Sequence, residues 1–333
     1  MKVQTRMEDQ SMLLLGVDGG GTKTMVVACS CSGEYLGGVS CGSINYNAVG
    51  MKTARENMAA GIDGILRKTG RKDYRFITIG HSALDDVASD EEKTAFGETI
   101  LDKDKLYMLS DADVALKGST LGGYGALIIS GTGSIGVAVD KTGVKHVAGG
   151  WGYLLHDTGS GFAIGMGAIL SAVRDYERGV SGPLEEAVKA HFNVNEMRAV
   201  IPVIYAEDFL PSSIASLAID VEKIAEAGDD EANRILTETS GHLADFVFSL
   251  FRQAKGALDG ASVYVYGSIL QKCQIVRREF ERLVHERYPD TLIAAPGLPA
   301  ECGALIFSAE HCGLSGETFV QTLENTYKLA KGR

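Results

Sequence analysis

The sequence has little proline, a single tryptophan and no surplus of positive charge. Its 333 residues include 6 prolines, and 32 Lys and Arg stand against 43 Asp and Glu, for a net charge of −11. A net-negative chain without a basic run lacks the electrostatic footprint of a nucleic-acid-binding protein. The longest apolar runs, such as residues 13–15, are far shorter than the roughly 20 residues that a membrane-spanning helix needs. We therefore expect neither a nucleic-acid partner nor a membrane partner.

The cysteines and the first residues indicate the compartment. The six cysteines include no C-x-x-C pair, and at this chain length they favour free thiols in a cytosolic protein over a disulfide framework. The first dozen residues carry charges of both signs and no apolar stretch, which is not the pattern of a signal peptide. The sequence therefore predicts a cytoplasmic protein.

Glycine is abundant, with 41 residues, and 45% of the chain is hydrophobic. That content is ample for a buried core, and the length predicts about two domains. Apolar runs predict two successions of strands with similar order, separated by helices. The expected strands are 13–17, 24–29, 34–39, 76–79 and 106–109, then 126–130, 134–139, 144–148, 263–267 and 291–295. One expected helix has Ala54, Met58, Ile62, Ile65 and Leu66 on one face. The other expected helices are 90–102, 160–178, 183–206, 212–256, 269–287 and a terminal helix, and the helix 212–256 is expected to break at 228–230. This order predicts an α/β fold with mixed sheets, formed by an internal duplication joined near 115–125.

Two glycine turns occupy matching places in the two successions, DGGGT at 18–22 and SGTGS at 130–134. The chain has no Gly-Lys dipeptide and hence no P-loop, and the G-x-G-x-x-G match at 131–136 leads into a strand, whereas a dinucleotide fingerprint opens a helix. Each turn is either an ordinary tight hairpin or a phosphate loop whose backbone N–H groups approach an anion. Their duplication favours phosphate binding, through Gly20, Gly21, Thr22, Lys23, Gly131, Thr132 and Gly133.

Two aspartates stand near the ends of predicted strands. Asp111 follows the strand 106–109 at its carboxyl end, where ligand-contacting groups of open α/β sheets lie. It can act as the base that takes the proton of an attacking hydroxyl in phosphoryl transfer, or it can cap a helix. Asp18 can be a turn residue, or it can hold Mg²⁺ through water near the phosphates.

Three further polar or stacking residues lie in glycine-rich turns. The run GGWG at 149–152 combines an accessible backbone with the stacking surface of Trp151. Asp157 either caps the following helix or accepts hydrogen bonds from ligand hydroxyls. Asn45, in the turn GSINYN, either binds a polar ligand or forms the turn.

These blocks together resemble a known family. DGGGT, S-D-A at 110–112, SGTGS, GGWG with D-x-G-S up to residue 160, and a late strand ending in Gly267-Ser268 occur in the same order in the N-acetylglucosamine kinase branch of the sugar kinase, Hsp70 and actin superfamily. That branch belongs with the BadF/BadG/BcrA/BcrD ATPases. The resemblance covers roughly residues 13–310.

The resemblance implies two ribonuclease-H-like lobes, 12–117 and 118–333, with ATP and Mg²⁺ in the cleft between them and the last helix packing back on the N-terminal lobe. It implies that Asp111 is the base that takes the proton from the 6-hydroxyl of an amino sugar. Gly267 and Ser268 would form the adenosine-contacting turn, and a homodimer is expected. The residues expected near the sugar are Asn45, Ser82, Gly150, Trp151 and Asp157.

Several positions depart from the family pattern. Thr158 stands where Glu is common, Ala83 replaces a glycine in the turn 80–85, and Ser268 replaces the second glycine of the adenosine turn. The sugar therefore stays open among N-acetylglucosamine, glucosamine, N-acetylmannosamine and N-acetylmuramic acid. One alternative is a BadF-type ATPase activator, which needs closely placed cysteines for a [4Fe–4S] cluster that the sequence lacks. Another is a sensor that binds ATP and sugar without catalysis.

Overall fold

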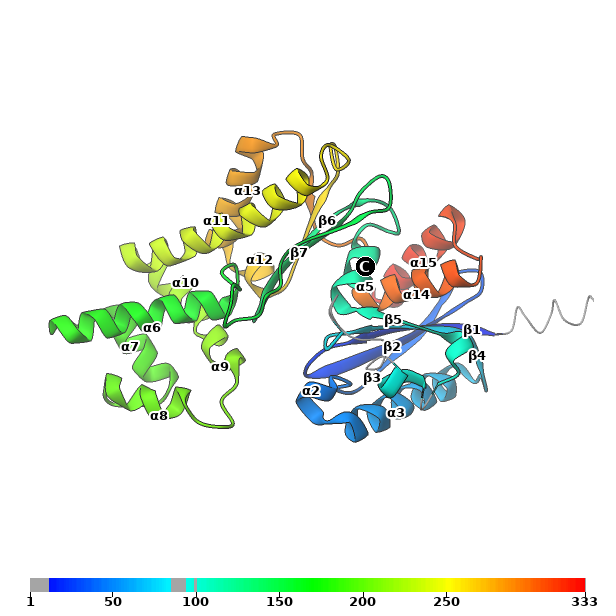
Figure 1. Ribbon diagram of the computed structural model, residues 1–333, viewed down its shortest axis with the longest axis horizontal. Coiled ribbons are helices and arrows are strands. Elements are labelled where there is room, and N and C mark those ends of the chain that lie inside the picture. Colours follow the sequence, from blue (N-terminus) through cyan, green and yellow to red (C-terminus); the bar gives the residue numbers. More distant parts are fainter. Residues whose placement is uncertain (1–11, 85–93, 99–100, 333) are drawn as a thin grey trace, which may run out of the picture. The chain divides into compact units, whose positions relative to one another are not determined.

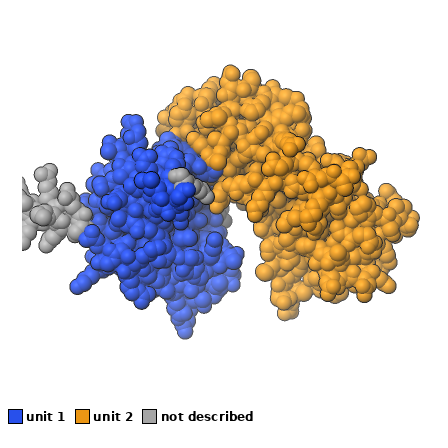
Figure 2. All heavy atoms as spheres, turned by 180° about the vertical axis from the view of Figure 1, so that it is seen from behind, with its two compact units in different colours: residues 1–123, 296–333 blue, residues 124–295 orange. Residues whose placement is uncertain are grey.

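The chain forms two compact units in the computed structural model, which describes residues 12–84, 94–98 and 101–332. Unit 1 comprises residues 1–123 and 296–333, and unit 2 comprises residues 124–295 (Figure 2). The expected lobe boundary at 117/118 lies six residues before this division. The last 38 residues of the chain belong to unit 1.

Unit 1 contains a five-stranded sheet with the order β3-β2-β1-β4-β5. The strands are β1 Leu13–Gly19, β2 Lys23–Ser30, β3 Tyr35–Gly42, β4 Tyr74–His81 and β5 Leu106–Ser110. The first three strands are antiparallel neighbours, and β4 and β5 run parallel to β1, so that the sheet is mixed. All five strands expected from the first succession of apolar runs are present.

Helices cover both faces of the unit 1 sheet because its strands alternate apolar residues between the two sides. Leu13, Leu15 and Val17 pack with α3 Met51–Thr69, whose predicted apolar face is buried at Ala54, Met58, Ile62 and Ile65. Leu14 instead packs with α14 Ala300–His311 and α15 Glu317–Ala330 on the opposite face (Figure 1). The remaining elements are α2 Tyr46–Val49, η1 Thr94–Glu98, η2 Lys103–Lys105 and α5 Asp111–Ser119. The helix expected over 90–102 lies partly outside the described residues.

Helices α5 and α14 of unit 1 pack at very short range through glycine. A methyl group at Gly303 would lie 1.9 Å from the Val114 carbonyl oxygen and 2.5 Å from the Gly118 nitrogen. A methyl group at Gly118 would in turn lie 2.6 Å from the Pro299 carbonyl oxygen. The crossing therefore holds the middle and the C-terminal end of α5 against the N-terminal half of α14.

Unit 2 repeats the topology of unit 1, since its sheet order β10-β9-β6-β7-β8 is the unit 1 order read from the other edge. Its strands are β6 Gly125–Ser130, β7 Ser134–Val139, β8 Lys145–Gly149, β9 Val263–Tyr266 and β10 Ile293–Ala294. Again the first three are antiparallel neighbours, and the last two run parallel to the first. The predicted fold of two mixed sheets flanked by helices is confirmed.

The helices of unit 2 are shorter than the sequence predicts. The expected helix 183–206 ends early because the chain turns at Asn193, which has a left-handed φ of 52°. The expected helix 212–256 divides in two places, near Leu217 and at the predicted break, where Gly228 has a φ of 96° and Asp229 caps the next helix. The elements are α6 Gly161–Arg178, α7 Pro183–His191, η3 Met197–Ala199, α8 Val200–Ile204, α9 Pro211–Ser216, α10 Ala218–Glu226, α11 Asp230–Gln253, α12 Ser268–Lys272 and α13 Gln274–Arg287.

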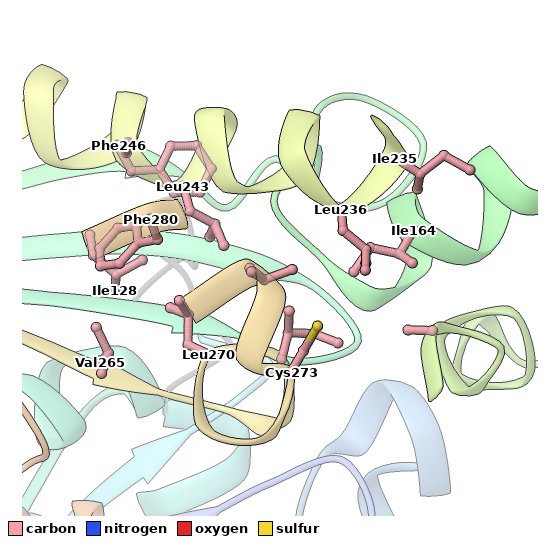
Figure 3. Packing of buried hydrophobic residues seen from close by; sticks show 14 of the residues in the cluster. Ile128, Ile164, Ile235, Leu236, Leu243, Phe246, Val265, Leu270, Cys273 and Phe280 are labelled. Carbon is pink, nitrogen blue, oxygen red and sulfur yellow. The ribbon is translucent and has the colours of Figure 1, made fainter. Parts of the chain in front are cut away.

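The long helix α11 packs its apolar face over the unit 2 sheet. Leu243 and Phe246 of α11 join Ile128 of β6 and Phe280 of α13 in one buried cluster, which Leu270 and Cys273 also enter (Figure 3). The joint between α12 and α13 is thereby held in the core. Among the residues that the structure describes, no helix is both long and apolar enough to cross a membrane.

Candidate functional site

The first glycine turn, DGGGT, joins β1 to β2 in unit 1, and the hydrogen bonds that hold it are made by the backbone of Gly20. The Gly20 N–H donates to the Lys23 carbonyl at 3.1 Å, and the Ser43 hydroxyl donates to the Gly20 carbonyl at 3.0 Å. Gly21, Thr22 and Lys23 are exposed, and a methyl group at Gly21 would meet no described atom within 4 Å. Neither Gly20 nor Gly21 has the left-handed φ that would itself require glycine. The backbone conformation alone therefore does not require glycine at these two positions, and the exposed backbone at Gly21 is open to close approach.

Asp111 is the first residue of α5, directly after β5. The helix N-cap is Ser110, whose hydroxyl accepts from the Asp113 N–H at 3.2 Å, so Asp111 does not serve as the cap. Its carboxyl is largely buried, and burial raises its pKa. The interpretation of Asp111 as a helix cap is therefore wrong. Its carboxylate, partly removed from water, lies at the carboxyl end of a parallel strand.

Asp18 lies in β1 within reach of two other acidic groups of unit 1. Burial, followed by the negative charges of Glu301 and Asp111, raises the pKa of Asp18 to about 7, and Lys23 opposes this rise. Three desolvated carboxylates therefore share one region of the unit. Their oxygen chemistry is the kind that Mg²⁺ prefers. Within the described residues, however, no group of three or more His, Cys, Asp or Glu is placed to ligate a metal directly.

Glu301 was not a candidate from the sequence, although it is the third of these carboxyls. It lies in the first turn of α14, and burial raises its pKa. The segment PAECGALIF in which it lies is predominantly apolar and small, and it reads as a core helix. Only the packing of α14 on β1 and α5 brings Glu301 to the aspartates.

The structure brings Asn45 and Ser82 together in unit 1. The Asn45 Nδ2 donates to the Ser82 Oγ at 3.0 Å, and the Ser82 N–H donates to the Gly19 carbonyl at 2.9 Å. Asn45 also caps α2, since its Oδ1 accepts from two N–H groups. The turn-forming alternative for Asn45 therefore holds, and it places the amide beside the first glycine turn. Asp85, the last residue of the turn 80–85, lies outside the described residues.

The second glycine turn, SGTGS, joins β6 to β7 in unit 2. Because β7 begins at Ser134, the G-x-G-x-x-G match leads into a strand, as predicted, and the dinucleotide interpretation fails. The Gly131 carbonyl accepts from the Gly161 N–H at 2.8 Å, and the Thr132 carbonyl accepts from the Phe162 N–H at 3.3 Å. These bonds hold the turn against the first residues of α6.

Gly267 and Ser268 lie beside this turn because β6 and β9 are parallel neighbours that end at the same edge. Gly267 has a left-handed φ of 93°, and a methyl group there would lie 2.2 Å from the Ser130 carbonyl oxygen. A pocket of about 260 Å³ extends from Gly131 and Thr132 past Ser268, and α9, α10 and α12 line its other walls. The two predicted nucleotide-contacting turns of unit 2 thus border one pocket.

Gly150, Trp151 and Asp157 also lie in unit 2. Gly150 has a left-handed φ of 74°, and the side chain of Trp151 is 66% exposed. Ser160 caps α6, so Asp157 is not its cap. The Asp157 Oδ1 is buried and has no hydrogen-bond partner among the described residues, while a methyl group at Gly133 would lie 2.7 Å from Oδ2. Asp157 therefore lies against the second glycine turn with an unused acceptor.

Comparisons with known proteins found relatives that cover most of the chain. The chain is 27% identical over 305 residues to the N-acetylmuramic acid/N-acetylglucosamine kinase of Clostridium acetobutylicum, covering 90% of this chain and 99% of that protein. It is 28% identical over 313 residues to the N-acetyl-D-glucosamine kinase of Dictyostelium discoideum, covering 89% and 97%. The solved structure of a candidate N-acetylglucosamine kinase from Chromobacterium violaceum superposes with a TM-score of 0.71 at 23% identity, covering 89% of this chain and 99% of that one, and supports the fold.

The sequence model of one family extends over almost the whole length of the two units. It matches residues 15–308, which include both glycine turns, Asp111, Asp157 and the Gly267 turn. This chain belongs to the BadF/BadG/BcrA/BcrD ATPase family.

Proposed function

We propose that this protein is an ATP-dependent kinase that phosphorylates an amino sugar of the N-acetylglucosamine class at its 6-hydroxyl. The observation that carries the proposal is Asp111, a partly buried carboxyl after a parallel strand, where Ser110 and not Asp111 caps the helix. The names of the two curated relatives support the substrate class.

The nucleotide would be bound by the two glycine turns and the Gly267 turn. The open backbone at Gly21 and Gly131, where a methyl group would meet no described atom within 4 Å, suits phosphate oxygens. The pocket beside Gly131, Thr132 and Ser268 suits a nucleoside. Mg²⁺ would be held near Asp18 through water, and when bound it would neutralise charge on the phosphates.

In the transfer step, Asp111 accepts the proton of the sugar 6-hydroxyl as that oxygen attacks the γ-phosphorus of ATP. The bond from the γ-phosphorus to the β-bridging oxygen breaks, ADP leaves, and the sugar 6-phosphate remains. Burial raises the pKa of Asp111 and so makes its carboxylate a better proton acceptor. Asn45, Ser82, Gly150, Trp151 and Asp157 would contact the sugar, and the unpaired Asp157 Oδ1 suits a sugar hydroxyl.

The substitution Asp111→Asn tests the proposal. We expect it to lower kcat by about 10²- to 10⁴-fold, the usual contribution of a general base, and to leave the Kd for ADP nearly unchanged. Asp113→Asn is the matched control, since it removes the same charge from the same helical turn. Release of ADP is measured with the four candidate amino sugars. Near-normal turnover of Asp111→Asn would refute the role of Asp111, and sugar binding without ADP release in the wild type would instead support the sensor alternative.

A further inference from the structure

The pocket of unit 2 contains a carboxylate that the proposed transfer reaction does not use. Among the described residues that line it, Glu222 of α10 is the one acidic side chain and Lys272 of α12 the one basic side chain. The walls contributed by Ala215, Ile219 and Ile269 are apolar. An acidic group in a pocket that borders a proposed phosphate loop needs an explanation, because a carboxylate repels phosphate.

Glu222 is held in place by a hydrogen bond from the first residue of α13. Its Oε1 accepts from the Gln274 N–H at 2.8 Å, the first N–H of α13, whose N-cap residue Cys273 makes no side-chain cap. Cys273, the residue before Gln274, is buried, and burial is the main cause that raises the pKa of its thiol to about 12, so the thiol stays uncharged beside Glu222. Cys273 is in turn packed in the core with Leu270 (Figure 3). The orientation of the Glu222 carboxylate is therefore set before any ligand binds.

These bonds do not exhaust the acceptor capacity of Glu222. An ionised carboxylate offers about four lone-pair sites and can only accept. It therefore favours a ligand that presents hydroxyl or N–H donors and disfavours an anionic group. In a nucleotide whose phosphates lie at Gly131 and Thr132 and whose base lies against the apolar walls, the ribose lies between them. Its two hydroxyl groups are donors of this kind, and acidic residues bind ribose hydroxyls in other nucleotide sites.

We propose that Glu222 binds the ribose hydroxyls of the nucleotide and makes the site selective for ribonucleotides over deoxyribonucleotides. This inference rests on the proposed function, because it takes the unit 2 pocket as the nucleoside site. Because Glu222 is half-buried, we take the lower end of the free-energy range for a hydrogen bond to a charged acceptor. That free energy corresponds to about a tenfold change in Kd.

Calorimetric titration of the full-length protein with ADP, 2′-deoxy-ADP and 3′-deoxy-ADP tests the proposal. We expect the wild type to bind ADP about tenfold more tightly than at least one deoxynucleotide. Glu222→Ala should bring that ratio close to one by weakening ADP binding. Glu222→Gln should also reduce the ratio while it keeps an oxygen for the Gln274 N–H. Glu226→Gln, on the exposed face of the same helix, is the control and should keep the wild-type ratio.

The outcomes separate the inference from the proposed function. A wild type that binds all three nucleotides equally would overturn the role of Glu222 and leave the nucleotide site standing. In Glu222→Ala, an equal loss of affinity for all three nucleotides, with a lower Tm and an unchanged ratio of Kd values, would overturn the ribose role. Glu222 would then be only a structural cap of α13. A wild type that binds none of them, with or without Mg²⁺, would overturn the proposed function itself.

Discussion

Gly303, at the crossing of α5 and α14, allows a prediction of how a substitution changes the free energy of unfolding. In Gly303→Ala the new methyl group would lie 1.9 Å from the Val114 carbonyl oxygen, whereas ordinary contacts begin at 3.4 Å. Because the obstacle is helix backbone and not a flexible side chain, the two helices must separate by about 1.5 Å, the difference between those distances. Overpacking of this kind costs about 1–3 kcal/mol, and occasionally more.

A second effect of the same substitution acts in the opposite direction. Alanine is favoured over glycine inside a helix by about 0.8–1 kcal/mol. Because the obstacle is backbone at 1.9 Å, we expect a cost at the upper end of the overpacking range, and hence a net loss of about 2 kcal/mol in the free energy of unfolding. Gly241→Ala, inside α11, isolates the propensity effect because a methyl group there would meet no described atom within 4 Å. That control should gain about 0.5–1 kcal/mol.

Urea denaturation followed by far-UV circular dichroism distinguishes the two variants. The midpoint should fall for Gly303→Ala and rise for Gly241→Ala, with the slope m unchanged in both. A Gly303→Ala protein as stable as the wild type, or a Gly241→Ala protein that loses as much as Gly303→Ala, would refute the packing argument.

Two further predictions concern His81, the last residue of β4 in unit 1, and Gly267 of unit 2. His81 is fully buried, and its Nδ1 accepts from the Ala83 N–H at 3.0 Å, which only a neutral ring can do. Burial lowers its pKa to about 4, so its stabilising contribution is complete above the unfolded pKa of about 6.5 and is lost as the pH falls towards 4. Between pH 7 and pH 5 the wild type should lose about 2 kcal/mol more than His81→Asn in urea titrations, and equal losses would contradict this assignment. Gly267→Ala should weaken ADP binding at least tenfold in calorimetry, because its methyl group would meet the Ser130 carbonyl oxygen at 2.2 Å and displace the turn beside the pocket. Gly260→Ala, which has a similar left-handed φ of 75° but open space around it, should lose stability only and should bind ADP normally.

The sequence predicted the sheets well because their signals are local. Apolar runs located each strand of the residues that the structure describes, and the strand after SGTGS excluded a dinucleotide fold. Helix lengths were less accurate in unit 2, where apolar residues recur across breaks that depend on backbone conformation, as at Asn193.

The candidate site was only partly predictable, for a related reason. Asp18, Asp111 and the glycine turns belong to short motifs, whereas Glu301 and Glu222 belong to no motif. Glu301 stands 190 positions after Asp111 and approaches it only through the packing of α14 on α5. Glu222 lines the pocket because residues of α10 and α12, about 50 positions apart in the sequence, border it together. Such residues are found by tertiary contacts and not by periodicity.

The division of the chain into units has a consequence for the order of folding during synthesis. Unit 2 is one continuous segment, whereas unit 1 needs residues from both sides of it. Until α14 and α15 leave the ribosome, Leu14, Val27 and Cys29 on the unit 1 sheet lack the apolar side chains that cover them. We therefore expect unit 2 to complete its core first, and residues 1–123 of unit 1 to depend on chaperones or on slow synthesis until the last helices are made. Because the entropy of closing a loop grows only slowly with its length, the large insertion itself costs unit 1 little once its last helices arrive.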